Sequence, residues 1–162
     1  FEIKKFFRKH KKIIIKPIHS YGGNDINLIS GKLNLIKIKQ ILKKHGHIMC
    51  QKFLNKIKFG DKRVFIINGK VCGAISRVPK SGSILSNMSK GAKPKIAFLS
   101  NKELKVSNII AKKIKKDGIY FAGIDFIDGK LNGDINVTSP TGIKTYFDLS
   151  QINLAKTFWK DL

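Results

Sequence analysis

The chain contains only two cysteines and three arginines, and it has no long apolar run. Cys50 and Cys72 are too few for a disulfide framework or a cysteine metal cluster, and each lies in an apolar, strand-like run where a small buried thiol is typical. No apolar run approaches the roughly 20 residues that span a bilayer, and no hydrophobic signal core opens the chain. We therefore expect a reducing, cytoplasmic setting and no membrane partner.

Acidic residues are also scarce, since 10 of them face 33 basic residues and leave a net charge of +23. Such a charge first suggests a nucleic-acid partner. However, 33 minus 3 arginines leaves 30 lysines, and these are spread over almost every segment. The aromatic residues are mostly Phe inside apolar runs, not interleaved with the basic residues as stacking platforms. Nucleic acid is therefore not an expected partner.

The 162 residues fit one domain or two small lobes that share a cleft, and apolar periodicity predicts an α+β fold with mostly antiparallel strands. We expect helices at 2–11, 34–45, 100–116 and 148–160, and strands at 12–17, 26–30, 48–54, 62–67 and 70–78. Asn68-Gly69 suits a type I′ hairpin turn, and Ser100 with Glu103 forms a capping box. Residues 79–98 are predicted to form a long surface loop, a kind that is usually functional.

Oxygen-bearing side chains gather around a second predicted hairpin. Asp134 and Asn136 point to one face of a strand, and the turn at 128–130 brings Asp125 near that face. Two carboxylates and a carboxamide suit a hard cation such as Mg²⁺, which also binds nucleotide phosphates. The alternative is that these residues only build the turn of a hairpin.

Several cationic or glycine-rich positions suit a phosphate ligand. Lys16 ends a strand just before the Gly22-Gly23 loop, where backbone amides can approach phosphate oxygens. The alternatives are a plain surface lysine and an ordinary tight turn. The stretch Gln51-Lys52-Phe53-Leu54, at the end of a strand, is a candidate to offer backbone groups to an adenine edge.

Arg63 and Arg77 are placed on the two strands of the first hairpin. Because the chain uses lysine almost everywhere, we expect these two arginines where a planar, bidentate and permanently charged group is needed. Such a pair suits a clamp on a carboxylate or an acyl phosphate. The alternative is a pair of exposed salt-bridge partners.

Read in order, these motifs resemble the ATP-grasp half of bacterial glutathione synthetases. The resemblance rests on Ile-Ile-Lys-Pro with a Gly-Gly loop, Gln-x-Phe-Leu, Gly-Asp-Lys-Arg, a strand ending Arg-Val-Pro, Gly-Ile-Asp, and Ile-Asn-Val-Thr-Ser-Pro-Thr. Its most specific part is residues 134–141, because related ATP-grasp ligases have Asn-x-Ser-Pro-Gly there. It covers nearly the whole chain.

The resemblance implies an ATP-grasp fold in which two α+β lobes, about 1–54 and 55–162, grip ATP. It implies ligation of γ-glutamylcysteine to glycine through an acyl phosphate, with Mg²⁺ or alternatively Mn²⁺. Asp125, Asp134 and Asn136 would hold the metal. Nucleotide contacts would come from Lys16, Gly22, Gly23, Gln51, Lys52, Phe53, Leu54 and Asn87. Arg63 and Arg77 would be catalytic, and substrate would meet Arg63, Ser139, Pro140 and Thr141.

Three departures accompany the resemblance. Asp134 stands where the family normally has Glu, and Leu85-Ser86-Asn87 stands where its lid loop has Arg-Gly-Asn. The family's N-terminal substrate domain is absent, and the chain begins with Phe1 rather than Met. We therefore expect a fragment or a processed chain, or one that needs a complementary N-terminal domain or a second copy of itself.

Two other functions remain open from the sequence. The first is a different ATP-grasp carboxylate–amine ligase acting on another acidic peptide. The second is a non-catalytic basic binding module that keeps the fold.

Overall fold

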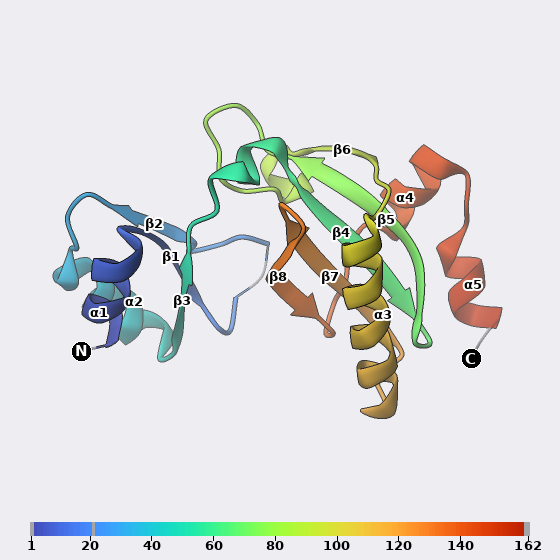
Figure 1. The fold of residues 1–162 in the computed structure, drawn as a ribbon, viewed down its shortest axis with the longest axis horizontal. Coiled ribbons are helices and arrows are strands. Elements are labelled where there is room, and N and C mark those ends of the chain that lie inside the picture. Colours follow the sequence, from blue (N-terminus) through green and yellow to red (C-terminus); the bar gives the residue numbers. More distant parts are fainter. Residues whose placement is uncertain (1, 21, 161–162) are drawn as a thin grey trace. The chain divides into compact units, whose positions relative to one another are not determined.

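The computed structural model describes residues 2–20 and 22–160, apart from the side chains of residues 132–134. The chain divides into two units, residues 1–55 and 56–162, and each is described by itself (Figure 1). In the described part of the chain, no helix is both long and apolar enough to cross a membrane.

The first unit is a three-stranded antiparallel sheet with two helices on one face. β1 (Lys12–Pro17) lies between β2 (Asn27–Ser30) and β3 (Ile48–Lys52), and both helices, α1 (Glu2–His10) and α2 (Leu35–His45), contact β1 and β3. The burial of β1 alternates, so that Ile13 and Ile15 are fully buried among helical side chains such as Phe7 and Ile38. Because strand side chains alternate between faces, Lys16 lies on the sheet face opposite the helices.

The second unit is a five-stranded antiparallel sheet in the order β6-β5-β4-β7-β8. A short 3₁₀ turn, η1 (Asn55–Phe59), precedes it. The strands are β4 (Asp61–Ile67), β5 (Lys70–Val78), β6 (Lys93–Ile96), β7 (Phe121–Ile127) and β8 (Lys130–Asn136). Because β4 lies in the middle, its residues are almost all buried, as expected for a strand covered on both faces.

Helices cover both faces of this sheet. α3 (Asn101–Lys116) packs on one face through Ala111 and Ile114, which join Val64, Ile66 and Ile124 in one core. The other face carries α4 (Ile143–Ser150) and α5 (Leu154–Lys160), with a second core of Phe65, Ile67, Ile75, Tyr146 and Leu154. The odd and even residues of β4 thus belong to different cores.

Most of the predicted elements are confirmed. Both hairpins form, with strands β4–β5 and β7–β8 paired antiparallel on either side of their predicted turns. The capping box of α3 is present, since the Ser100 hydroxyl accepts from the Glu103 amide and the Glu103 carboxylate accepts from the Ser100 amide at 2.8 Å. Cys50 and Cys72 lie in strands, where both are partly buried, and they are not joined in a disulfide.

Three predicted elements are wrong. The single helix at 148–160 is two helices, because Gln151 takes a left-handed conformation with φ 62° and Asn153 caps α5 by accepting from the Lys156 amide. The segment 79–98 is not all loop, since it contains the 3₁₀ turn η2 (Met88–Lys90) and the edge strand β6. β3 ends at Lys52 rather than at residue 54.

Glu103 links α3 to the sheet, since its carboxylate also accepts from Lys62 Nζ at 2.8 Å. Burial alone would raise the pKa of Glu103, but hydrogen bonds from Lys62 and Ser100 hold it below the usual value of 4.5. The carboxylate therefore stabilises the fold fully above pH 4.5, and that contribution is lost as pH falls through the lower folded pKa.

We expect Glu103→Gln to lower the free energy of unfolding by about 1–2 kcal/mol at neutral pH, and the difference from wild type to shrink on acidification. Urea unfolding followed by circular dichroism between neutral pH and pH ~3 measures this. Glu2→Gln, at the exposed start of α1, is the control. If the difference in unfolding free energy between Glu103→Gln and wild type grew as pH falls, the stabilising role of the Glu103 carboxylate would be contradicted.

Candidate active site

Four charged side chains lie together on one face of the second unit's sheet. Asp61 and Arg63 of β4 alternate with residues that pack against α3, and so do Arg77 of β5 and Asp125 of β7. Because side chains alternate along a strand, all four lie on the face that carries α4 and α5. Strand pairing sets Asp61 opposite Arg77 and Arg63 opposite Asp125.

Arg63 and Asp125 form a bidentate pair across β4 and β7. Arg63 Nε donates to Asp125 Oδ1 at 2.8 Å, and its Nη2 donates to Oδ2 at 2.7 Å. The remaining nitrogen, Nη1, lies 3.4 Å from both the carbonyl and the hydroxyl oxygen of Thr141. This fork geometry needs arginine, because an ammonium group cannot donate two parallel hydrogen bonds to one carboxylate in this way.

Arg77 joins both carboxylates. Its Nε donates to Asp61 Oδ1 at 2.8 Å and its Nη2 donates to Asp61 Oδ2. The same Nη2 lies 3.0 Å from Asp125 Oδ2. The hydroxyl of Ser86, in the segment after β5, also donates to Asp61 Oδ2. The result is one connected network of two cations, two anions and a hydroxyl.

The network is buried and neutral. Each of its four charged residues is at most 6% exposed. Two positive and two negative charges therefore compensate each other in a region shielded from water. Burial would raise the pKa of Asp125, but hydrogen bonds from Arg63 and the charges of both arginines hold it below its ordinary value. Burial, with the nearby charge of Asp125, raises the pKa of Asp61 despite Arg77.

The turn after β8 is organised by Asn136. Its side-chain oxygen accepts from the backbone amides of Thr138 and Ser139 at 3.2 and 3.0 Å, and its Nδ2 donates to the Ser139 carbonyl at 3.3 Å. The side chain of Asp134 lies outside the described residues. Pro140 packs beside the backbone of β7, where a Cβ on Gly123 would come within 3.3 Å of it.

The first unit carries the remaining predicted positions. Gly22 and Gly23 have φ values of +66° and +77°, so both need glycine for their backbone conformation. Gln51 and Lys52 end β3 and pair with β1, while Phe53 donates its amide to the Lys12 carbonyl at 3.1 Å and stacks under the Lys12 ammonium. Leu54 follows β3, and Asn87, in the second unit, directly precedes η2.

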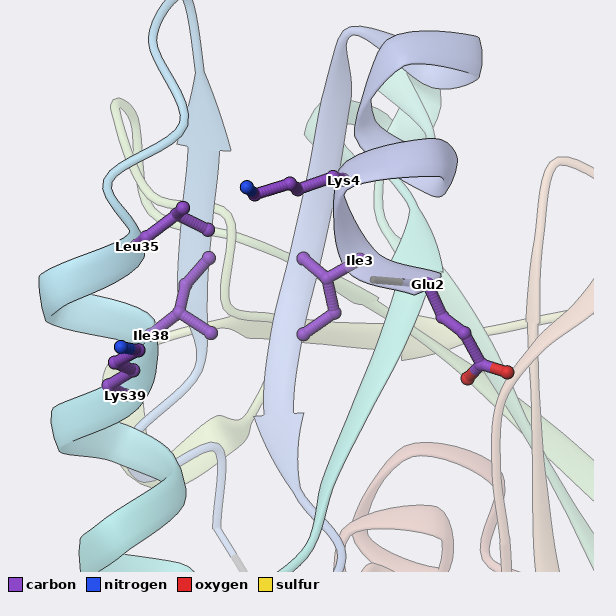
Figure 2. A pocket seen from close by; sticks show the side chains of 6 residues that line it. All are labelled: Glu2, Ile3, Lys4, Leu35, Ile38 and Lys39. Atoms are coloured by element: carbon purple, nitrogen blue, oxygen red, sulfur yellow. The ribbon is translucent and has the colours of Figure 1, made fainter.

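A groove of about 600 Å³ opens between α1 and α2 on the helical side of the first sheet. Ile3 and Ile38 point toward each other across it, while Glu2 points away (Figure 2). Lys16 lies on the other face of this sheet, so the groove is separate from the predicted phosphate contact of the first unit.

Residues 1–151 match the family described as the prokaryotic glutathione synthetase ATP-grasp domain. The chain belongs to this family. Among curated relatives, the glutathione synthetase of Synechocystis sp. is 32% identical over 157 residues, which cover 95% of this chain and 49% of that protein. The glutathione synthetase of Buchnera aphidicola is 37% identical over 147 residues, covering 88% of this chain and 46% of that protein. The chain thus spans about half the length of the relatives it matches.

Solved structures show the same fold at low sequence identity. The D-alanine–D-alanine ligase of Bacillus anthracis complexed with ATP has a TM-score of 0.66 at 14% identity, over 99% of this chain and 55% of that one. The ATP-grasp ligase PsnB complexed with minimal precursor, Mg and ADP has a TM-score of 0.64 at 15% identity, over 98% of this chain and 49% of that one. The chain therefore has the ATP-grasp fold.

Two of the three predicted metal ligands, Asp125 and Asn136, have described side chains. Asp125 is a buried carboxylate whose Oδ1 accepts a hydrogen bond from Arg63 Nε, and an ionised carboxylate oxygen can accept a further ligand. Asn136 Oδ1 already accepts hydrogen bonds from two backbone amides, those of Thr138 and Ser139. Among the described residues no group of three or more His, Cys, Asp or Glu could hold a metal ion. A hard cation would therefore need Asp134 and phosphate oxygens as well.

The sequence alone did not single out Asp61 or Ser86 as site residues. Asp61 lies two residues before Arg63, so the period of two in a strand already places both side chains on one face. That signal could have identified Asp61. Nothing local marks Ser86, because its contact with Asp61 joins residues 25 positions apart through the return of the segment after β5.

We expect Arg63→Lys to lower the free energy of unfolding of the second unit by about 2–4 kcal/mol, because one ammonium cannot satisfy the buried Asp125 carboxylate at both oxygens. Urea unfolding followed by the fluorescence of Trp159, the single tryptophan, reports on this unit. Arg8→Lys, at an exposed position of α1, is the matched control and should leave stability unchanged. Equal stability of both variants would show that the fork geometry is dispensable.

Proposed function

We propose that this chain is the ATP-grasp part of a glutathione synthetase, which joins γ-glutamylcysteine to glycine with ATP. The observation that carries the proposal is the match of residues 1–151 to the glutathione synthetase ATP-grasp domain. In the proposed reaction, the γ-phosphoryl group of ATP passes to the C-terminal carboxylate of γ-glutamylcysteine. The glycine amine then attacks the acyl phosphate, and the new amide bond forms as inorganic phosphate and a proton leave.

In this proposal, the first unit contributes nucleotide contacts. Lys16 and the amides of the Gly22-Gly23 loop hold phosphate oxygens, since positive φ values open the backbone to a ligand. The end of β3 and the following residues, Gln51, Lys52, Phe53 and Leu54, flank the adenine, and Asn87 of the second unit contacts the nucleotide. These positions are supported by residue type and by the family of the chain.

The second unit contributes positioning and charge. In this proposal, Thr141, with Ser139 and Pro140, lines the peptide site. The 3.4 Å contact between Thr141 and Arg63 Nη1 supports a cationic group beside it. Arg77 is only 3% exposed and its donors meet Asp61 and Asp125, so in this arrangement it orders the carboxylates. A Mg²⁺ or Mn²⁺ ion held by Asp125, Asp134 and Asn136 would act as a Lewis acid on the phosphates.

The proposed setting is a reducing cytoplasm, which suits two cysteines that are not joined in a disulfide. Because the chain spans about half of its relatives, we propose that a complementary N-terminal domain completes the peptide site, either on the same polypeptide or as a partner. Neither nucleic acid nor a membrane has a role in this proposal.

The proposal predicts ADP release when the chain meets its substrates. A coupled assay would supply Mg-ATP, γ-glutamylcysteine and glycine, with and without a complementary N-terminal domain. We expect release that depends on both amino-acid substrates. Release with another acidic peptide in place of γ-glutamylcysteine would identify a different ligase. If no arrangement releases ADP but Mg-ATP still binds, the enzymatic proposal fails and a binding function remains.

The proposed metal role of Asp134 has its own test. Asp134→Asn should weaken Mg-dependent ATP binding by about tenfold or more, because it removes a carboxylate from a hard cation. Isothermal titration with and without Mg²⁺ measures the dissociation constant. Asp128→Asn, in the turn of the same hairpin and paired with Lys56 on the surface, is the control and should bind as wild type does. Unchanged affinity in Asp134→Asn would remove that residue from the site.

A further inference from the structure

The segment between β5 and β6, residues 79–92, is tied to the sheet by a buried side-chain hydrogen bond. Ser86 Oγ donates to Asp61 Oδ2, and both residues are at most 9% exposed. A glycine at position 86 would offer no hydroxyl to Asp61. A short bond between a buried hydroxyl and a buried carboxylate is charge-assisted and therefore directional.

This hydrogen bond is the first link of a continuous chain. Asp61 Oδ2 is shared between Ser86 and Arg77 Nη2, and that Nη2 also lies 3.0 Å from Asp125 Oδ2. Asp125 Oδ2 in turn accepts from Arg63 Nη2 at 2.7 Å. Donors and acceptors alternate along this chain. Loss of the hydrogen bond at one end therefore changes the strength of the hydrogen bonds that the next group makes.

We propose that Asp61 is a positioning residue, which couples the 79–92 segment to Asp125 through Arg77, with the Ser86 hydroxyl as the contact on the segment. While Ser86 and Arg77 hold Asp61, the carboxylate is fixed in the plane of the Arg77 fork, and one Arg77 nitrogen reaches Asp125. When the Ser86 hydroxyl moves away from Asp61, the side chains of Asp61 and Arg77 can rotate together. The contact between Asp125 Oδ2 and Arg77 Nη2 then weakens, and the Asp125 carboxylate is held mainly by its hydrogen bonds from Arg63.

The inference uses the proposed function only to regard Asp125 as a ligand-facing group. The contacts themselves are independent of any reaction. A test that reads the arginine side chains directly therefore separates failure of this inference from failure of the proposed function.

The chain is suited to such a test because it contains only three arginines, Arg8, Arg63 and Arg77. Their side-chain Nε–Hε groups give at most three signals in a ¹⁵N-correlated NMR spectrum, and Arg63→Lys and Arg8→Lys assign them. We expect Ser86→Ala to shift the Arg77 signal and, to a smaller extent, the Arg63 signal. Ser86→Thr keeps the hydroxyl and should restore both. Ser81→Ala, at an exposed position of the same segment, is the control.

A second measurement follows the segment. Limited proteolysis within residues 79–92 should be about tenfold faster in Ser86→Ala than in wild type, since one charge-assisted hydrogen bond is lost. Asp61→Asn should give the same acceleration and move both arginine signals, which tests the central residue separately. Far-UV circular dichroism confirms that each variant is folded.

The outcomes are distinct. If Ser86→Ala changes neither the arginine signals nor the cleavage rate relative to Ser81→Ala, the coupling does not exist. If it changes cleavage and the Arg77 signal but never the Arg63 signal, Ser86 anchors the segment without reaching Asp125, and the inference is overturned. ADP release by wild type bears on the proposed function alone.

Discussion

The second unit depends on the balance of charge buried between its three central strands. Two guanidinium groups and two carboxylates lie almost out of contact with water, and each guanidinium group donates to a carboxylate of the network. Removing one partner leaves an uncompensated buried charge, which costs about 3–5 kcal/mol. The register of β4 with β5 and of β4 with β7 therefore has to keep Asp61 opposite Arg77 and Arg63 opposite Asp125.

This balance also limits what the two arginines can do. A guanidinium group that is free in a cleft can clamp an incoming anion directly. Here both arginines already hold carboxylates of the chain, and Arg63 also has a nitrogen 3.4 Å from the Thr141 oxygens. In this chain Arg63 and Arg77 therefore have unequal positions, one beside Thr141 and one inside the network.

Sequence rules predicted the elements whose stability is local. The two hairpins follow from turn residues at fixed offsets, and α3 follows from a cap and a carboxylate three residues apart. The misses have tertiary causes. β6 is a four-residue edge strand with two lysines and a proline, so it exists only because β5 offers hydrogen-bond partners. The break between α4 and α5 depends on a left-handed backbone conformation at Gln151, and the sequence has no glycine at that position to indicate it.

The sequence by itself determined the family and the α+β class. The use of only three arginines beside 30 lysines already indicated that Arg63 and Arg77 make bidentate contacts. Only the tertiary structure decided the partners, because these contacts join residues 62, 16 and 25 positions apart, across strand pairs and a returning segment. A pattern read along the chain shows which face a side chain takes, while folding decides which carboxylate it meets there.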